Sequence, residues 1–330
     1  KLQPIAPADA RLTWEGAVSL EKTPGYVAPW RVKFAERGLF YPELQNKAAD
    51  ATGVRLRFRS DTTSISGKID PVPDMRPMDL VLGGEVAATL EMDNRPGFEF
   101  TGLPAGEKLV EIWVTNWGPF RLKEFGIDAG ASLSPAPDEG KRWITYGSSI
   151  TQCRGAASAT QTWPAIVARD MDLNLTCLGF GGQCHLEPMI LRTIRDLPAD
   201  FISICAGINV YGGASLGPRT FRQALVGGVR LIRERHPEVP ITLQSPIYAW
   251  TRETNPNAVG FTVPQMREEV RAAVEILREH GDANVHYVDG LEILGEADAD
   301  LLPDQLHPDP DGYRLMGRNF LEKVARKHFA

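Results

Sequence analysis

The sequence has little of what several protein classes require. Its 330 residues include only four cysteines and no CxxC pair, whereas a structural zinc site usually draws its ligands from such close pairs. No apolar run is long enough to span a bilayer. Asp and Glu (42) outnumber Lys and Arg (36), which argues against nucleic acid or an anionic membrane as the main partner. There is also no internal repeat and no low-complexity tract.

The cysteines and the first residues bear on the compartment. Cys177 and Cys205 lie inside apolar runs, and Cys184-His185 is the only adjacent pair of soft ligands. We therefore expect buried free thiols rather than zinc ligands or disulfides. The chain opens KLQPIAPADA, without a basic and then apolar leader. Together these features favour a cytoplasmic protein.

The first 130 residues have the pattern of β-structure. In GVRLRFRS, Val54, Leu56 and Phe58 alternate with three arginines, which is the period of a strand. MDLVLGG, EVAATLEM, GFEF and EKLVEIWVT follow, each bounded by Gly, Pro, Asn or Asp. This spacing is typical of antiparallel strands, and no amphipathic helix is evident between them. We predict a β-sandwich or jelly-roll domain over residues 1–130.

After a short stretch of small, Pro and acidic residues the pattern changes. Residues 131–140 carry small and acidic residues without a core pattern, and we predict a linker there. Over residues 141–330, five short apolar runs alternate with amphipathic stretches, such as the one in which Val270, Ala273, Val274 and Leu277 share a helix face. The alternation predicts an α/β domain with a five-stranded parallel sheet and helices on both faces. In such sheets the active site forms at the carboxyl ends of the strands.

Residues suited to acyl transfer follow the predicted strands. Ser149 stands in the turn after ITY, and Gly182 and Asn209 follow the next two strands. Asp304 precedes His307 by three residues, just before the final helix. A serine needs an imidazole to take its proton, and the imidazole needs an acceptor on its other nitrogen. Each residue alone also has a structural reading as a turn or cap residue, and the argument depends on their occurring together.

These residues resemble the sequence blocks of the SGNH (GDSL-type) serine hydrolases, over roughly residues 141–327. YGSSIT is similar to the block with the nucleophile, LGFGGQ and GINV to the blocks with the oxyanion hole, and DQLHP to the block with the remaining triad residues. The resemblance implies Ser149, Asp304 and His307 as the catalytic triad. It implies Ser149, Gly182 and Asn209 as the oxyanion hole, and neither a metal nor an organic cofactor.

The chain departs from the family pattern at two positions. Ser148 stands where the family usually has Asp, and Val210 stands where its third block often has a second Asp. Neither position carries the nucleophile or the proton, so the departures bear on substrate preference. GASLG offers a competing serine, Ser215, in the pattern of other α/β hydrolases. It lies ten positions after its strand instead of directly after it, and we interpret it as a flexible loop residue.

Two classes of function follow. The first is an enzyme that acts through a Ser149 acyl-enzyme on a small-molecule ester or acyl thioester. Base rates favour an esterase, and the alternative is an O-acyltransferase that moves an acyl group, such as an aromatic one, from a thioester like acyl-CoA to a hydroxyl acceptor. The second class is a carbohydrate-binding protein on an inactive hydrolase scaffold, in which tryptophans of the β-domain stack on sugar rings. The candidates for that stacking are Trp14, Trp30, Trp113 and Trp117.

Overall fold

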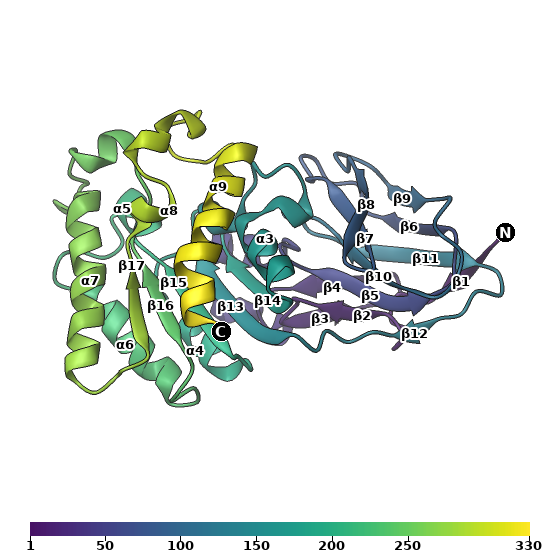
Figure 1. The fold of residues 1–330 in the computed structure, drawn as a ribbon, viewed down its shortest axis with the longest axis horizontal. Helices are drawn as coiled ribbons and strands as arrows, with labels where there is room; N and C mark the ends of the chain where they lie inside the picture. The colour runs from purple at the N-terminus through teal and green to yellow at the C-terminus, as the bar shows by residue number, and fades with distance from the viewer. The chain divides into compact units, whose positions relative to one another are not determined.

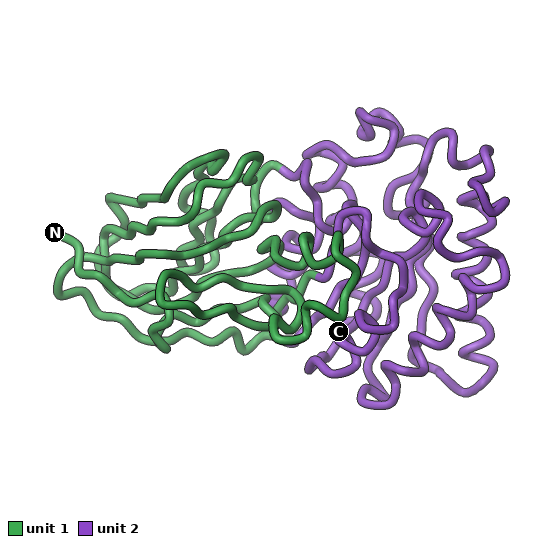
Figure 2. The backbone as a smooth tube through the Cα atoms, turned by 180° about the vertical axis from the view of Figure 1, so that it is seen from behind, with its two compact units in different colours: residues 1–140, 157–160, 174–177 green, residues 141–156, 161–173, 178–330 purple.

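The computed structural model describes residues 1–330, which form two compact units (Figure 2). The first, here called the β-unit, comprises residues 1–140, 157–160 and 174–177. The second, the α/β-unit, comprises residues 141–156, 161–173 and 178–330. The longest helix has 17 residues and several charges, and no helix is suited to crossing a bilayer.

The β-unit is built from two antiparallel sheets that enclose one apolar core (Figure 1). In the first sheet the strand order is β3-β4-β11-β6-β9, and β1 pairs with β11. In the second the order is β12-β5-β10-β7-β8, and β2 pairs with β5. The first sheet consists of β1 (Leu2–Ile5), β3 (Ser19–Lys22), β4 (Val27–Trp30), β6 (Ile65–Ile69), β9 (Gly97–Phe100) and β11 (Leu122–Asp128). The second consists of β2 (Thr13–Glu15), β5 (Arg55–Ser60), β7 (Met78–Leu82), β8 (Glu85–Leu90), β10 (Lys108–Trp113) and β12 (Ser134–Pro135).

Strand β5 shows how the alternation places residues. Leu56 and Phe58 are at most 1% exposed, and the Phe58 ring meets Phe125 of the opposite sheet at 5.7 Å. The other face of β5 is not simply exposed to solvent, because Arg55 on that face is only 1% exposed. Two further features lie outside the predicted pattern. The β-unit contains one short helix, α1 (Pro42–Ala48), and the segment predicted as a linker pairs with β5 through β12.

The tryptophans considered for sugar stacking are engaged within the β-unit. Trp113 is 3% exposed, and the Trp14 ring packs on Phe120 at 6.3 Å. Trp30 Nε1 donates to Glu21 Oε2, and the Trp117 ring faces the ammonium of a lysine. The open groove along β1, β6 and β11 is lined by neither tryptophan nor tyrosine. Trp113 is therefore too buried to stack on a sugar ring, whereas Trp14, Trp30 and Trp117 are half-buried and each already makes a contact within the β-unit.

A five-stranded sheet in the order β14-β13-β15-β16-β17, with parallel pairing, belongs to the α/β-unit except for residues 174–177 of β14 (Figure 1). Its strands are β13 (Lys141–Gly147), β14 (Leu173–Gly179), β15 (Phe201–Cys205), β16 (Ile241–Gln244) and β17 (Val285–Val288). The five predicted apolar runs coincide with these strands. The predicted fold class, a parallel five-stranded α/β sheet preceded by a β-sandwich, is confirmed.

Helices cover both faces of this sheet. Helix α3 packs against α9 on one face, and α4, α6 and α7 pack side by side on the other (Figure 1). The predicted apolar face of α7 is buried, since Val270, Ala273, Val274 and Leu277 are all at most 3% exposed. The helices are α2 (Ser149–Gln152), α3 (Trp163–Asp170), α4 (Pro188–Asp196), α5 (Ile208–Gly213), α6 (Phe221–Arg233), α7 (Val263–Glu279), α8 (Gly290–Ile293), α9 (Pro310–Phe320) and α10 (Arg326–His328). Short 3-10 or π-helical turns occupy Phe34–Leu39, Ala159–Gln161, Trp250–Glu253, Glu296–Leu301 and Leu321–Ala325.

Candidate active site

The two neighbouring serines at the end of β13 have different environments. Ser148 is the N-cap of α2: it is 4% exposed, and its Oγ accepts the Ile150 N–H at 3.2 Å. Ser149 is the first residue of α2, and its Oγ lies 2.9 Å from His307 Nε2. Ser and Asp are both good N-cap acceptors. Ser148, at the position where the family usually has Asp, therefore still caps α2.

His307 and Asp304 come from the loop that precedes α9. His307 Nδ1 lies 2.7 Å from Asp304 Oδ2, and the backbone N–H groups of Leu306 and His307 donate to Asp304 Oδ1. Burial alone would raise the pKa of Asp304, but hydrogen bonds from the His307 backbone and ring and from Leu306 outweigh it and lower the pKa. An ionised Asp304 accepts the Nδ1–H, which leaves the Nε2 lone pair facing the Ser149 hydroxyl.

Three hydrogen-bond donors of the predicted oxyanion hole have no acceptor within the protein. They are the backbone N–H groups of Ser149 and Gly182 and the amide Nδ2 of Asn209. Gly182 has a φ of +73° in the turn that the Gln183 N–H closes on the Phe180 carbonyl, a position that favours glycine. Asn209 Oδ1 accepts the Cys184 N–H at 2.9 Å, which fixes the orientation of the amide.

The competing thiols near these residues are poor nucleophiles. Cys184 and Cys205 are free cysteines, and the Cys184 Sγ donates to the Cys205 carbonyl at 3.5 Å. Burial raises the pKa of Cys205 to about 12 and raises the pKa of Cys184 further. Because the thiolate is the reactive form, neither thiol competes with a serine at neutral pH.

An apolar pocket lies beside Ser149. It is lined by Ser148 and Ile150 on either side of the serine, by Leu306 next to His307, and by the loop after β16. No charged side chain lines it. The loop wall is held by Arg267, which donates to the Pro246 and Ile247 carbonyls and makes a bidentate ion pair with Glu253. The space between these residues is only about as large as one water molecule, so the lining would have to move apart to admit an acyl group, and that lining is apolar.

Ser215 lies in a different setting from that expected of a flexible loop residue. Its Oγ is 2.6 Å from His185 Nδ1, and His185 Nε2 lies 3.0 Å from the Gly182 carbonyl oxygen. No carboxylate holds the second nitrogen of this histidine, in contrast to His307. The sequence carries no signal for this contact, since the two residues are 30 positions apart.

The arrangement around Ser149 has the parts that acyl transfer needs. A hydroxyl faces a histidine nitrogen that can take its proton, and a carboxylate orients the ring. Donors without acceptors come from three separate strand ends. The five residues singled out from the sequence thus lie in the segments that follow β13, β14 and β15 and in the loop before α9, all within the α/β-unit.

Two family profiles and a solved structure match this chain. The profile of the GDSL-like lipase/acylhydrolase family matches residues 145–315, and that of the SsfX3 N-terminal domain matches residues 12–123. The chain is 37% identical to the salicylyl-acyltransferase SsfX3 from a tetracycline biosynthetic pathway, with 99% of this chain and 97% of that chain covered and a TM-score of 0.91. No protein with a curated description matches.

More distant structures share the fold. A family two carbohydrate esterase from Cellvibrio japonicus is 14% identical, with a TM-score of 0.67 over 99% of this chain and 98% of that chain. One from Clostridium thermocellum, in complex with cellohexaose, is 15% identical, with a TM-score of 0.69 over 96% and 98%. The family profile covers more than half of this chain, and the likeness to SsfX3 spans nearly all of it. The chain therefore belongs to the GDSL-like lipase/acylhydrolase family.

Proposed function

We propose that this protein is a serine acyltransferase that moves an uncharged acyl group from an acyl thioester to a hydroxyl acceptor. The observation that carries the proposal is the hydrogen-bonded chain from Ser149 through His307 to Asp304, with 2.9 and 2.7 Å between successive side chains. The full-length similarity to a salicylyl-acyltransferase supports transfer over hydrolysis. The uncharged and mostly apolar lining beside Ser149 supports an uncharged acyl group.

The reaction proceeds in two halves. Ser149 Oγ attacks the thioester carbonyl while His307 Nε2 takes its proton, and Asp304 stabilises the imidazolium. The negative charge on the carbonyl oxygen is stabilised by the Ser149 and Gly182 N–H groups and by Asn209 Nδ2. The intermediate then collapses, the C–S bond breaks, and His307 returns the proton to the leaving thiol. An acceptor hydroxyl attacks the acyl-enzyme by the same steps in reverse, which releases the ester and free Ser149.

Hydrolysis differs only in the second half, where water replaces the acceptor hydroxyl. An esterase is the second candidate function, because the matched family includes acylhydrolases. Whether water or an alcohol attacks the acyl-enzyme depends on how well the bound acceptor excludes water from the site. The two functions are therefore separated by the products and not by the first half-reaction.

Mass spectrometry of the acyl-enzyme tests the proposal. The full-length protein is mixed with acetyl, benzoyl, salicylyl and succinyl thioesters of coenzyme A and quenched in acid. We expect an adduct on the peptide that contains Ser149 with the uncharged acyl groups. Succinyl transfer should be at least about tenfold slower, because its carboxylate would be desolvated in a pocket without a charged partner.

The products distinguish the two candidate functions. With alcohol and phenol acceptors added to the same mixtures, we expect the ester to form faster than the free acid. Free acid alone, at every acceptor concentration, would establish the esterase instead. If none of the thioesters and no p-nitrophenyl ester acylates Ser149, acyl transfer itself is wrong.

The Asn209→Ala variant tests the oxyanion hole. Asn209 Nδ2 is the only side-chain donor among the three, and removing one such donor costs about 10²- to 10³-fold in kcat. We expect a loss of that size with little change in KM, measured with a p-nitrophenyl ester. Asn209→Asp is the matched control, because it keeps the acceptor for the Cys184 N–H but replaces the donor with a carboxylate oxygen. An active Asn209→Asp enzyme would contradict the assignment.

A further inference from the structure

Two segments that carry oxyanion donors are tied to each other at the carboxyl edge of the sheet. Gly182 lies in the loop after β14, and Asn209 is the second residue of α5, the helix after β15. The Cys184 N–H donates to Asn209 Oδ1 at 2.9 Å, which is one link between them. His185 makes a second link, since its ring lies between the Gly182 carbonyl oxygen at 3.0 Å and Ser215 Oγ at 2.6 Å.

A single neutral tautomer of His185 satisfies both ring contacts. A carbonyl oxygen can only accept, so Nε2 carries the hydrogen and donates to Gly182. Nδ1 then has a free lone pair and accepts the Ser215 hydroxyl hydrogen. The ring lies close against the end of α5, because a Cβ at Gly213 would come within 3.0 Å of His185 Cε1. The histidine is therefore held on both sides.

Gly182 needs such support more than most residues. No atom outside its chain neighbours lies within 4 Å of the place where its Cβ would be, so packing does not hold it on that side. Glycine also has the largest backbone freedom of any residue. Gly182 lies inside the turn that the Gln183 N–H closes on the Phe180 carbonyl, and its own carbonyl oxygen is held by the His185 ring.

We propose that His185, held by Ser215, is a positioning residue that fixes the Gly182 N–H in the oxyanion hole. The inference rests on the proposed function, because it assigns a role in stabilising the same oxyanion. It also gives Ser215 a role other than that of a second nucleophile. The second nitrogen of His185 faces a neutral carbonyl, which stabilises an imidazolium far less than the carboxylate that His307 has.

The test compares His185→Ala, His185→Gln and Ser215→Ala in the full-length protein, with p-nitrophenyl butyrate as substrate. We expect His185→Ala to lower kcat about 10- to 100-fold with KM within twofold, since a misplaced donor weakens only the transition state. Phenylboronic acid, whose tetrahedral adduct with an active serine places an oxygen in the oxyanion hole, should bind more weakly by a similar factor. His185→Gln should restore much of both, because its amide N–H can reach the Gly182 carbonyl.

His280→Ala is the matched control. His280 Nδ1 also contacts a backbone carbonyl, that of Ile276 at 2.8 Å, but at the end of α7 and outside the site. Wild-type kcat in His185→Ala, or a loss of kcat with unchanged boronic acid affinity, would overturn the proposal. If His185→Ala does not fold, Ser215→Ala decides: a kcat about threefold lower supports the proposal, and a wild-type kcat overturns it.

The failure of this inference can be told from the failure of the proposed function. A fluorophosphonate probe should label wild-type Ser149 and every folded variant above, since the nucleophile and its base are unchanged. If the wild type is labelled and active but His185→Ala matches it, only the positioning role is wrong. If the wild type is not labelled at Ser149, the proposed function has failed first.

Discussion

Replacing Ser149 with alanine is expected to lower kcat by about 10⁴- to 10⁶-fold, the range seen when a nucleophile of a catalytic triad is removed. The reason is that His307 then has no hydroxyl to deprotonate, and no covalent intermediate forms. The same variant should lose labelling by a fluorophosphonate and the acyl adduct seen by mass spectrometry. Its melting temperature should fall only slightly, because the only side-chain hydrogen bond lost is the one from the Ser149 hydroxyl to His307, and a hydrogen bond contributes about 1 kcal/mol.

Ser148→Ala is the control that this sequence offers. Ser148 is adjacent, has the same side chain and is buried, but its Oγ caps α2 by accepting the Ile150 N–H. Losing such a cap typically costs about 1 kcal/mol of stability. We expect a less stable protein that is still labelled at Ser149. Labelling of Ser149→Ala, or a folded Ser148→Ala protein that resists the probe, would move the nucleophile to Ser148.

The fold of the α/β-unit could be predicted from local patterns because each pattern reports burial directly. The face of α7 that carries Val270 and Ala273 is apolar at helical spacing, and it is the face that the sheet covers. The site residues could be proposed for a related reason. In a parallel sheet all strands end at one edge, so residues such as Ser149 and Asn209 that follow different strands come near one another.

What could not be predicted depends on partners far away in the sequence. The alternation of apolar and charged residues places Arg55 on the face of β5 opposite Leu56 and Phe58, but it does not show what covers that face. In the structure Arg55 is buried. Its partners include Asp138, 83 positions away in the segment predicted as a linker. The His185 contact with Ser215 is of the same kind. A histidine and a serine in two glycine-rich loops have no periodicity that could pair them.

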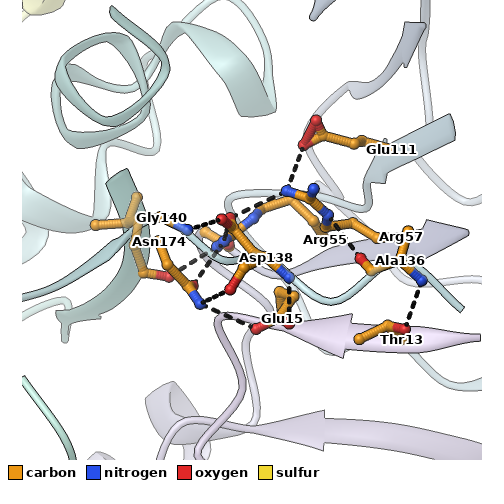
Figure 3. Close-up of polar contacts among 11 residues, drawn as sticks. Thr13, Glu15, Arg55, Arg57, Glu111, Ala136, Asp138, Gly140 and Asn174 are labelled. Atoms are coloured by element: carbon orange, nitrogen blue, oxygen red, sulfur yellow. Dashed lines mark hydrogen bonds and ion pairs between the residues drawn. The ribbon is translucent and has the colours of Figure 1, made fainter. Parts of the chain in front are cut away.

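Arg55→Met is expected to destabilise the β-unit by about 3–5 kcal/mol, the usual cost of removing one partner of a buried ion pair. Arg55 Nη1 donates to the Gly53 and Leu175 carbonyls. Its Nη2 donates to Asn174 Oδ1 and Asp138 Oδ2 (Figure 3). Methionine fills much of the volume but satisfies none of these acceptors, and buried acceptors without donors cost more than the hydrogen bonds contribute. At about 2–4 °C per kcal/mol for a unit of this size, the melting temperature should fall by at least about 6 °C.

The matched control lies on the same strand. Arg59 is exposed and its side chain makes no hydrogen bond or ion pair within the protein, so Arg59→Met should change stability by no more than about 0.5 kcal/mol. Arg55→Lys should fall between the two, because an ammonium keeps the charge but cannot donate along the several directions that a guanidinium serves. Arg57 also contacts Asp138, at 3.1 Å, and leaves this carboxylate with one cation in the Met variant. A thermal melt in which Arg55→Met and Arg59→Met coincide would show that the residual Arg57 pair is sufficient and that the acceptors around Arg55 find other donors.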